Sequence, residues 1–428
     1  MAVADVASAV GGVLKDVFAG NPKYQYVNKY FCLSQFKKKK PLRRVGNNFY
    51  MGVVEHGNDN ATFIGDGDAL PEAGKVTMDQ INIPLAYMYS AVKVTGPELE
   101  RTADTEGAFI AEKVLQMKTL AQDETRIENE WLYRDSSAAL ARVAMATPTL
   151  ANLTLDGEPA AGSDNTYGAR YIRNTIILSA ASTKSGGTIR TFRGVVANVD
   201  TRGDATTDQI DANGSGSSLG DLADNDYIFK QGERGNGIDG LPIAVDDGTR
   251  QASYLGIDAT AAGKDYWQAN RFPAVGALSE DILVQGIDAA EVDQDGDIDA
   301  LLSNKDARRF YFNKLVGDRH YVVNLDGKER RSDGMKYVGG FTGLAFSAGS
   351  DKEIPWMVDR DANLQTVYGL EMSRFFIVET SPAGFLDRDG SVMRQIPGYD
   401  TWAIIHKHFW NLGCERRNTQ TVWLGVSS

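Results

Sequence analysis

The sequence predicts a mixed α+β fold in which long extended segments accompany a packed body. Three observations carry this prediction. β-like residues on either side of a Gly-, Asn- and Asp-rich stretch predict a long hairpin over residues 49–95, and an amphipathic helix follows at about residues 105–133. From about residue 143 to 237 short β-rich runs dominate, and helices and strands then mix. A chain of 428 residues is long enough for two or three packed units.

The composition of the chain excludes several classes of protein. With 42% hydrophobic and 24% charged residues the chain is globular, and a net charge of -12 argues against a protein that coats nucleic acid tightly. Its two cysteines, Cys32 and Cys414, are far apart and fit no metal-ligand spacing, so we expect neither a disulfide scaffold nor a zinc site. No apolar stretch approaches the about 20 residues that span a bilayer, and no signal-like start is present. We expect a protein that folds in a reducing compartment.

The first residues predict a short amphipathic helix. Valines recur at spacings of three and four from Val3 to Val17, and Gly20-Asn21-Pro22 ends the pattern. Isolated helices this short are marginal in water. The segment therefore needs a partner surface, either on its own chain or as an arm exchanged with another copy.

One dense basic run stands out in this acidic chain. It consists of Lys37, Lys38, Lys39, Lys40, Arg43 and Arg44. It either faces phosphates or an acidic neighbour, or it is a solvated entry into a strand. Aromatic residues near the run are too sparse for a stacking platform, so we expect at most sequence-independent contact with a nucleic-acid backbone.

The hairpin at residues 49–95 cannot be stable alone. Phe49 to Val54 and Val76 to Thr95 are strand-like, with apolar residues at every second position from Ile81 to Tyr89, and the tip from Gly57 to Gly74 carries few large apolar groups. Two strands are barely stable in water, and ordering each backbone residue costs about 1–2 kcal/mol. The hairpin must lie on another surface, or it is the lid of an active site.

The helix at about residues 105–133 would be roughly 40 Å long. Asp104 or Thr105 is the expected cap, and an apolar face runs from Ile110 to Trp131. We assign Glu124 and Glu128 to the charged remainder of the helix surface.

The rest of the chain predicts a β module followed by an α+β body. The expected β runs of the module, a small barrel or sandwich, are Val143 to Leu155, Arg170 to Ser179, Thr188 to Asp200 and Asp226 to Lys230. In the body, Ser279 is the expected cap of a helix that buries Leu283, Ile287 and Ala290. The other expected elements are a strand Ile298 to Leu302, a helix Lys305 to Leu315 and a strand Trp356 to Val358.

Two glycine motifs match catalytic or nucleotide-binding patterns without the required context. Gly216 to Gly220 fits G-x-S-x-G around Ser218 but lies in Gly/Ser-rich loop sequence, whereas a nucleophile elbow joins a strand to a helix. Gly235 to Gly240 fits G-x-G-x-x-G, but Pro242 and the β-like Ile243 to Val245 follow in place of a helix. We interpret both as loops.

Two further patterns suggest metal binding. Residues 291–298 resemble the start of a calcium loop, but Leu302 occupies the position of the essential carboxylate, so an acidic turn from helix to strand is the better interpretation. His406 and His408 alternate along a strand and share a face, but no third ligand is visible, so we expect structural histidines. We predict no catalytic residue, no cofactor and no metal site.

The C-terminal part of the chain carries the most specific pattern. It runs Asp387-Arg388-Asp389-Gly390, then Ile396-Pro397-Gly398-Tyr399-Asp400, then two apolar strands that meet at Asn411-Leu412-Gly413 and close on Cys414-Glu415-Arg416-Arg417-Asn418. This pattern resembles the C-terminal signature of tailed-bacteriophage major capsid proteins of the Hong Kong 97-like fold. The resemblance covers nearly the whole chain and includes Gly67 to Pro71, Ile238 to Leu241, Val245 to Gly248, Ser279 to Leu283, Gly317 to Arg319 and Ile354 to Asp361.

This resemblance implies an order of domains along the chain. They are an N-terminal arm (1–48), an extended β-hairpin loop (49–95), the spine helix with part of the peripheral domain (96–142), the inserted β-barrel or sandwich module (143–237), an axial domain (238–370) and a C-terminal β part of the peripheral and axial core (371–428).

The resemblance also implies a function. Subunits of such proteins form hexamers and pentamers that close an icosahedral shell around double-stranded DNA, so we expect a virion protein that assembles in the host cytoplasm and touches DNA weakly, through the basic run. Expected partners are a portal, a decoration protein, and a separate scaffolding protein or none. Two alternatives stay open: the shell protein of an encapsulin-type compartment, and a loop-rich hydrolase whose hairpin is a lid.

Overall fold

The computed structural model describes the chain in segments that form two compact units. The described residues are 32–38, 44–57, 60–66, 74–103, 112–156, 171–200, 208–317, 345–347, 353–387 and 391–427. The first unit draws its described residues from Met1–Tyr50, Asn82–Leu132 and Phe376–Gly413, and the second from Met51–Ile81, Tyr133–Phe375 and Cys414–Ser428. The expected helix from Val3 to Val17 lies outside the described residues, as does the expected cap at Asp104 or Thr105.

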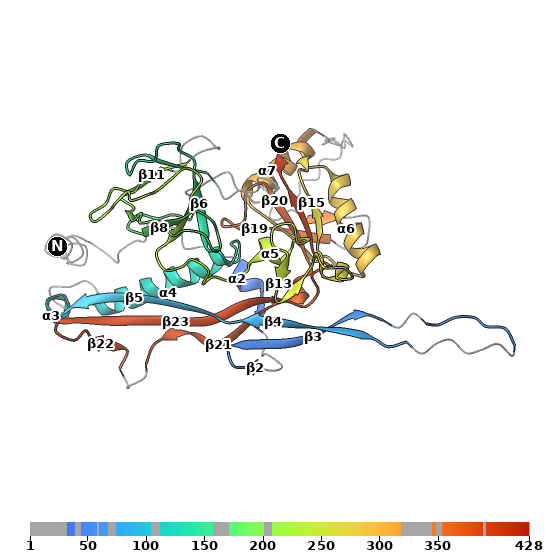
Figure 1. Cartoon of the computed structure of the whole chain (residues 1–428), viewed down its shortest axis with the longest axis horizontal. Coiled ribbons are helices and arrows are strands. Elements are labelled where there is room, and N and C mark those ends of the chain that lie inside the picture. The colour runs from blue at the N-terminus through green and yellow to red at the C-terminus, as the bar shows by residue number, and fades with distance from the viewer. Residues whose placement is uncertain are drawn as a thin grey trace, which may run out of the picture. The chain divides into compact units, whose positions relative to one another are not determined.

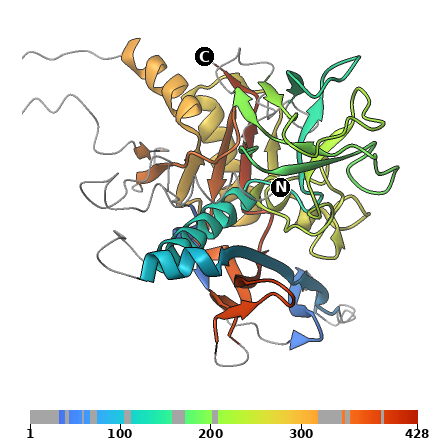
Figure 2. The ribbon, with the colours of Figure 1, turned by 90° about the vertical axis from the view of Figure 1, so that its left-hand side faces the viewer.

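The first unit is a five-stranded sheet with a long helix on one face. The longest strand, β23 (Thr401–Cys414), pairs antiparallel with β5 (Ala86–Thr95) over ten residue pairs. The sheet is completed by β21 (Phe375–Phe385), β22 (Met393–Gln395) and β1 (Lys37–Lys38). Helix α4 (Glu112–Trp131) lies along β5 and β23, while α2 (Cys32–Gln35) and α3 (Gly96–Ala103) are short (Figures 1 and 2).

The hairpin is built from β3 (Asn48–His56) and β4 (Thr77–Pro84), which β2 (Arg44–Val45) extends to three strands. The apolar alternation continues from β4 into β5, but its face changes at Leu85. Ile81 and Ile83 are buried, whereas Tyr87 and Tyr89, at the same parity, are about half exposed. The reason is that β4 and β5 belong to different sheets. The same alternation of apolar residues therefore faces different neighbours in the two strands.

The described residues between 139 and 230 form a barrel. The strands are β6 (Ala139–Val143), β7 (Leu153–Asp156), β8 (Ile177–Ala181), β9 (Gly194–Val195), β10 (Asn198–Asp200), β11 (Asp208–Asp211) and β12 (Tyr227–Lys230). Their order is β10-β11-β7-β6-β12-β8-β9. The chain is continuous from β9 to β10 and pairs with β8 through β9 and with β11 through β10, so the two edges of the sheet meet in one segment and the sheet closes.

Buried side chains fill this barrel, among them Leu153, Leu178 and Ile228, each fully inaccessible. The observed strands differ from the expected β runs in several places. The expected run from Val143 to Leu155 is two strands joined by a turn, and β11 was not anticipated because its sequence, Asp-Gln-Ile-Asp, has only one apolar residue.

The body of the second unit is a six-stranded sheet covered by helix α6 (Glu280–Gln294), with α7 (Lys305–Gly317) beside it (Figure 1). The sheet order is β15-β24-β20-β17-β19-β18. These strands are β15 (Asn270–Phe272), β17 (Ala300–Ser303), β18 (Ala345–Ser347), β19 (Glu353–Val358), β20 (Thr366–Leu370) and β24 (Thr421–Leu424).

The expected elements of the body are confirmed. Ser279 caps α6 by accepting a hydrogen bond from the Ile282 N–H, and Leu283, Ile287 and Ala290 are fully buried against the sheet. Shorter elements complete this unit. They are α5 (Leu241–Ala244), β13 (Ser253–Tyr254), β14 (Ile257–Asp258), η1 (Asp265–Trp267), β16 (Gly276–Ala277), η2 (Met372–Arg374) and β25 (Val426–Ser427). No helix in the described part of the chain is long and apolar enough to cross a bilayer.

Candidate functional site

Two histidine–glutamate pairs lie between β23 and α4 in the first unit. His406 and His408 share the buried face of β23, as their alternation predicted, and Glu124 and Glu128 lie one turn apart on α4. Nδ1 of His408 donates to Oε1 of Glu128 at 2.5 Å, and Nδ1 of His406 donates to Glu124. The Ser90 hydroxyl adds a hydrogen bond to Glu124 at 2.5 Å. Each buried imidazole is therefore paired with a buried carboxylate, although Oε1 of Glu124 has no hydrogen-bond partner among the described residues.

These pairs correct one prediction and confirm another. Glu124 and Glu128 are not on the solvent side of α4, because each is at most 4% exposed and faces an imidazole. The two histidines share one face of β23 as expected, and among the described residues no group of three or more His, Cys, Asp or Glu could hold a metal ion. A matching signal existed in the sequence: glutamates at i and i+4 on a helix have the spacing to face histidines at j and j+2 on a strand.

Two residues of the C-terminal pattern, Gly413 and Arg417, lie in closely packed surroundings. In the first unit, a Cβ on Gly413 would lie 2.6 Å from the Phe376 ring, so only glycine fits this contact. In the second unit, Arg417 is fully buried and donates to the carbonyl oxygens of Ile243 (2.7 Å), Ala244 (3.1 Å) and Trp267 (3.1 Å). Its guanidinium also lies over the Tyr254 ring, 5.2 Å from the centroid.

The hairpin is anchored at its base and exposed beyond it. Lys264 contacts Glu55 at 3.2 Å and Asp79 at 2.9 Å, and the Tyr266 hydroxyl donates to Asp79 at 2.9 Å. The hydrogen bond from Lys264 lowers the pKa of the Asp79 carboxyl and raises the pKa of the Lys264 ammonium. In contrast, every described residue from 60 to 66 is exposed, and Phe63 has the accessibility of an extended chain, 106%.

The structure describes only part of the basic run at residues 37–44. Lys37 and Lys38 form β1, which pairs in parallel with Phe376 and Ile377 of β21. Arg44 is exposed in β2 and donates from Nε to the carbonyl oxygen of Gly46 at 2.9 Å. Lys39, Lys40 and Arg43 lie outside the described residues, so a phosphate-facing role for the run stays a prediction.

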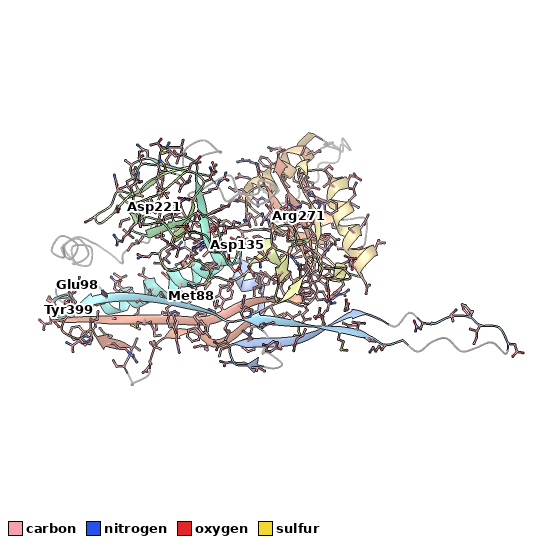
Figure 3. The ribbon with its side chains drawn as sticks, in the orientation of Figure 1. Met88, Glu98, Asp135, Asp221, Arg271 and Tyr399 are labelled. Carbon is pink, nitrogen blue, oxygen red and sulfur yellow. The ribbon has the colours of Figure 1, made fainter. Side chains whose placement is uncertain are left out.

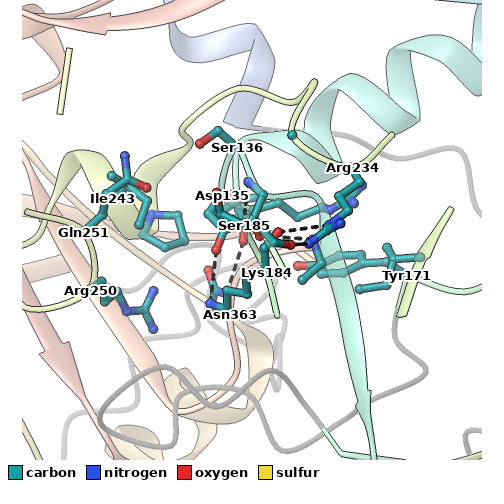
Figure 4. A pocket seen from close by; sticks show the side chains of 18 of the residues that line it. Asp135, Ser136, Tyr171, Lys184, Ser185, Arg234, Ile243, Arg250, Gln251 and Asn363 are labelled. Atoms are coloured by element: carbon teal, nitrogen blue, oxygen red, sulfur yellow. Dashed lines mark hydrogen bonds and ion pairs between the residues drawn. The ribbon is translucent and has the colours of Figure 1, made fainter. Parts of the chain in front are cut away.

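The second unit contains a basic pocket of about 840 Å³. It lies between the barrel and the body, and four basic residues and one acidic residue line it (Figure 4). The basic residues are Arg134, Lys184, Arg234 and Arg250, and the acidic one is Asp135. Burial lowers the pKa of the Arg250 guanidinium. The volume is within the range of about 300–1,000 Å³ that is typical of small-ligand sites.

Partners within the unit hold the pocket in shape. Arg234 donates to the carbonyl oxygens of Thr183 (2.8 Å), Lys184 (3.3 Å) and Gly186, and thereby orders one rim. Lys184 contacts Asp135 at 3.4 Å. Asp239, which accepts hydrogen bonds from the Ser136 N–H and from Gln251, has a raised pKa because it is buried. The sequence did not single out this pocket, because its residues come from seven separate stretches of chain.

The motif matches have structural explanations. Ser217 accepts from the Val195 N–H at 2.8 Å and donates to the carbonyl oxygen of Gly214 at 2.7 Å, while Ser218 forms a β-bridge with Arg193. This is loop structure, as predicted. The region after Gly240 is different from the prediction, because Leu241–Ala244 is one helical turn instead of a β-like run. Pro242 favours this start, and all four residues are buried.

The calcium-like segment is the end of a helix. Asp295 has a left-handed conformation (φ 51°) as the C-cap of α6, and the Gly296 N–H donates to the Ala290 carbonyl at 2.9 Å. The predicted acidic turn from helix to strand is confirmed. Figure 3 shows the side chains as sticks, with Asp221 on the barrel and Arg271 in the body.

Comparison with known proteins gives the fold. No protein-family model matches the sequence. No curated protein matches it either. Among solved structures, the chain is similar to a subunit of the capsid asymmetric unit of cyanophage A-1(L), with a TM-score of 0.53 and 11% identity over 97% of this chain and 98% of that one.

Two further structures have TM-scores below 0.5 and carry no weight in the argument. One is the capsid of a native GTA particle (TM-score 0.47, 9% identity, 100% of each chain). The other is the SrpI encapsulin of Synechococcus elongatus PCC 7942 (TM-score 0.44, 8% identity, 100% of this chain and 97% of that one). From the cyanophage likeness, which spans both chains almost completely, we conclude that this chain has the mixed α+β fold of the cyanophage A-1(L) capsid subunit.

Proposed function

We propose that the chain is a major capsid protein that assembles as hexamers and pentamers into an icosahedral shell around double-stranded DNA. The full-length likeness to a cyanophage capsid subunit carries this proposal. The exposed hairpin supports it, because an end carrying a fully exposed Phe63 and a half-exposed Ile64 gains apolar burial when copies interlock.

We assign the domains in the order that the sequence suggested. Residues 1–48 form the N-terminal arm, 49–95 the extended loop, 96–142 the spine helix region, 143–237 the inserted module, 238–370 the axial domain and 371–428 the C-terminal β part. The anchored base and exposed tip of the hairpin support the second assignment, and the long helix α4 on the β5–β23 sheet supports the third.

The charge distribution fits a container better than a DNA-coating protein. With a net charge of -12 the shell wall would hold packaged DNA loosely, which favours both packaging and release. We assign weak, sequence-independent DNA contact to Lys37, Lys38, Lys39, Lys40, Arg43 and Arg44. Portal, scaffolding and decoration proteins are the further partners of this proposal.

Electron microscopy of particles made by the purified protein tests the proposal. We expect closed icosahedral shells, and particles from infected cells should contain double-stranded DNA. A cargo enzyme in place of DNA would indicate an encapsulin-type compartment. A small oligomer whose hydrolytic turnover is lost with Ser218→Ala would contradict a shell role altogether.

A further inference from the structure

The basic pocket between the barrel and the body has the features of a ligand site that the shell proposal does not use. Its volume of about 840 Å³ is in the range of small-ligand sites, and four basic residues line it with one acidic residue. The whole chain, in contrast, has a net charge of -12. A concave site lined by one sign of charge concentrates ions of the opposite sign. The pocket therefore favours an anion.

Arg234 keeps its charge at one rim of the pocket. Its guanidinium donates to the carbonyl oxygens of Thr183 at 2.8 Å and Lys184 at 3.3 Å, and it lies over the Phe229 ring, 5.4 Å from the centroid. These contacts hold the guanidinium in place, but neither a carbonyl group nor an aromatic ring carries a net charge. The group is therefore fixed in position and still attracts an anion.

Arg250 supplies a second positive charge from the body, on a different side of the pocket from Lys184 (Figure 4). Burial lowers the pKa of the Arg250 guanidinium, Arg271 lowers it further, and Asp135 opposes the shift. The lowered pKa means that the charged form of Arg250 is costly at this position. A bound anion would offset that cost.

The other two cations of the pocket have carboxylate partners. Lys184 contacts Asp135 at 3.4 Å, and Arg134 contacts Glu233 at 3.4 Å. Each of these two charges is partly neutralised by its partner. The attraction for an anion therefore comes chiefly from the two arginines described above, whose planar groups match the spacing of phosphate oxygens.

An apolar wall belongs to the same pocket. Leu140, Pro242 and Ile243 line it, as does Ile189, whose side chain is 67% exposed. Inorganic phosphate would leave this wall in contact with water. A phosphate attached to an organic group would cover the wall, and burial of apolar surface would add to the affinity.

We infer that this pocket binds a small organic phosphate, a molecule with two or more negative charges and an apolar or aromatic body. The negative groups lie toward Arg234 and Arg250, and the body lies against Leu140, Pro242 and Ile243. This inference goes beyond the proposed function, because it requires neither assembly nor DNA. The bound molecule contacts the barrel and the body at once and thereby stabilises the contact between them.

Isothermal titration calorimetry of the purified full-length protein tests the inference. The probe is ATP without added divalent cations, since ATP combines a chain of phosphates with an aromatic base. ATP should bind at one site per chain. Tripolyphosphate should bind about tenfold more weakly, because it cannot cover the apolar wall, and adenosine should show no binding.

Three results of this titration would contradict the inference. An absence of ATP binding would overturn it as a whole. Equal affinities for ATP and tripolyphosphate would overturn the role of the apolar wall, and adenosine binding as tight as that of ATP would overturn the role of the arginines.

Two substitutions locate the binding site. Arg250→Gln should weaken ATP binding about tenfold, because it removes a charged donor from the pocket. Its control, Arg44→Gln, removes an exposed guanidinium from the basic run and should leave the affinity unchanged. Ile189→Glu adds a negative charge to the exposed part of the lining and should also weaken binding, whereas Val292→Glu, at an 82% exposed position on α6, should not. If Arg250→Gln does not fold, the pair at exposed positions decides, and equal affinities of its two members would overturn the assignment to the pocket.

The outcome is independent of the shell proposal. ATP binding by a protein that forms no shell would support the pocket assignment and contradict the proposed function. Shells formed by a protein that does not bind ATP would do the reverse. Displacement of ATP from the pocket by a short DNA duplex would assign the pocket to DNA and overturn the inference of a small organic ligand.

Discussion

Two regions of the second unit, the surroundings of Arg417 and the hairpin, differ in how much of their stability comes from contacts within the chain. Around Arg417, each nitrogen of the guanidinium donates to a carbonyl oxygen and the side chain is fully buried. In the hairpin, a few ion pairs hold the base, and the described residues of the tip contact solvent. The contacts around Arg417 stabilise the fold of the single chain. The second has little stability of its own beyond these ion pairs, because so little apolar area is buried within it.

This difference separates folding from assembly. Changes near Arg417 should destabilise the subunit before any shell can form. Changes at the tip should leave the subunit intact and act on the contacts between copies. The variants below test that separation, in order of decreasing effect on the stability of the subunit.

Arg417→Ala should have the largest effect. It leaves three buried carbonyl oxygens without a donor and removes the side chain that packs on Tyr254, so we expect a loss of about 4 kcal/mol in the free energy of unfolding. Arg417→Lys should recover part of this loss, because an ammonium group cannot reproduce the planar set of donors. Denaturant titration followed by tryptophan fluorescence measures both.

Arg309→Ala on α7 is the control for that measurement, since the Arg309 side chain is 64% exposed. It should change the free energy of unfolding by less than about 0.5 kcal/mol. Comparable losses from the two arginine variants would contradict the structural role assigned to Arg417.

Removing one member of a histidine–glutamate pair should cost less. His408→Ala leaves the buried Glu128 carboxylate without its closest donor, and we expect a loss of about 2 kcal/mol. The double variant His408→Leu/Glu128→Leu removes both polar groups and should be closer to wild type than either single change. A double-mutant cycle that showed simple additivity would mean that the pair is not coupled.

The hairpin base should respond to pH. The pKa of Asp79 is lowered in the folded chain, so its contribution is present above the ordinary aspartate value of about 3.9 and is lost as the pH falls through the lowered pKa. Protection of residues 51–56 and 77–81 against hydrogen exchange, measured relative to the intrinsic rate at each pH, should therefore fall on acidification. Asp79→Asn should raise exchange at neutral pH and remove most of the pH dependence. Unchanged exchange in this variant would show that other contacts hold the base.

The sequence predicted helices and strands correctly where a single periodic pattern of apolar residues packs against a single surface. Ser279, Leu283, Ile287 and Ala290 define α6 by cap and spacing, and the structure agrees at each position. The prediction was wrong at Glu124 and Glu128, because it assigned both glutamates to the solvent-exposed side of the helix from their charge alone. Their partners, His406 and His408, are about 280 residues away, and nothing local in α4 reveals them.

The same limit applies to the candidate sites. The tip of the hairpin was predictable, because its lack of large apolar residues is a local property of residues 57–74. The basic pocket was not, because Arg134, Lys184, Arg234 and Arg250 are spread over more than a hundred residues and converge only when the barrel meets the body. The one basic cluster visible in the sequence, at residues 37–44, is a different surface.

Phe63→Ser should have the smallest effect on the subunit and a large one on assembly. Because Phe63 buries no area in its own chain, its loss should change the free energy of unfolding by less than about 0.5 kcal/mol. Assembly should nevertheless weaken, since each copy loses an aromatic side chain that we place in an interface. Val292→Ser on α6, where the side chain is 82% exposed, is the matched control and should affect neither property. Light scattering during assembly, measured beside thermal unfolding of free subunits, distinguishes the two. If Phe63→Ser destabilised the free subunit as strongly as Arg417→Ala, the tip would belong to its own chain, and the separation between folding and assembly would be wrong.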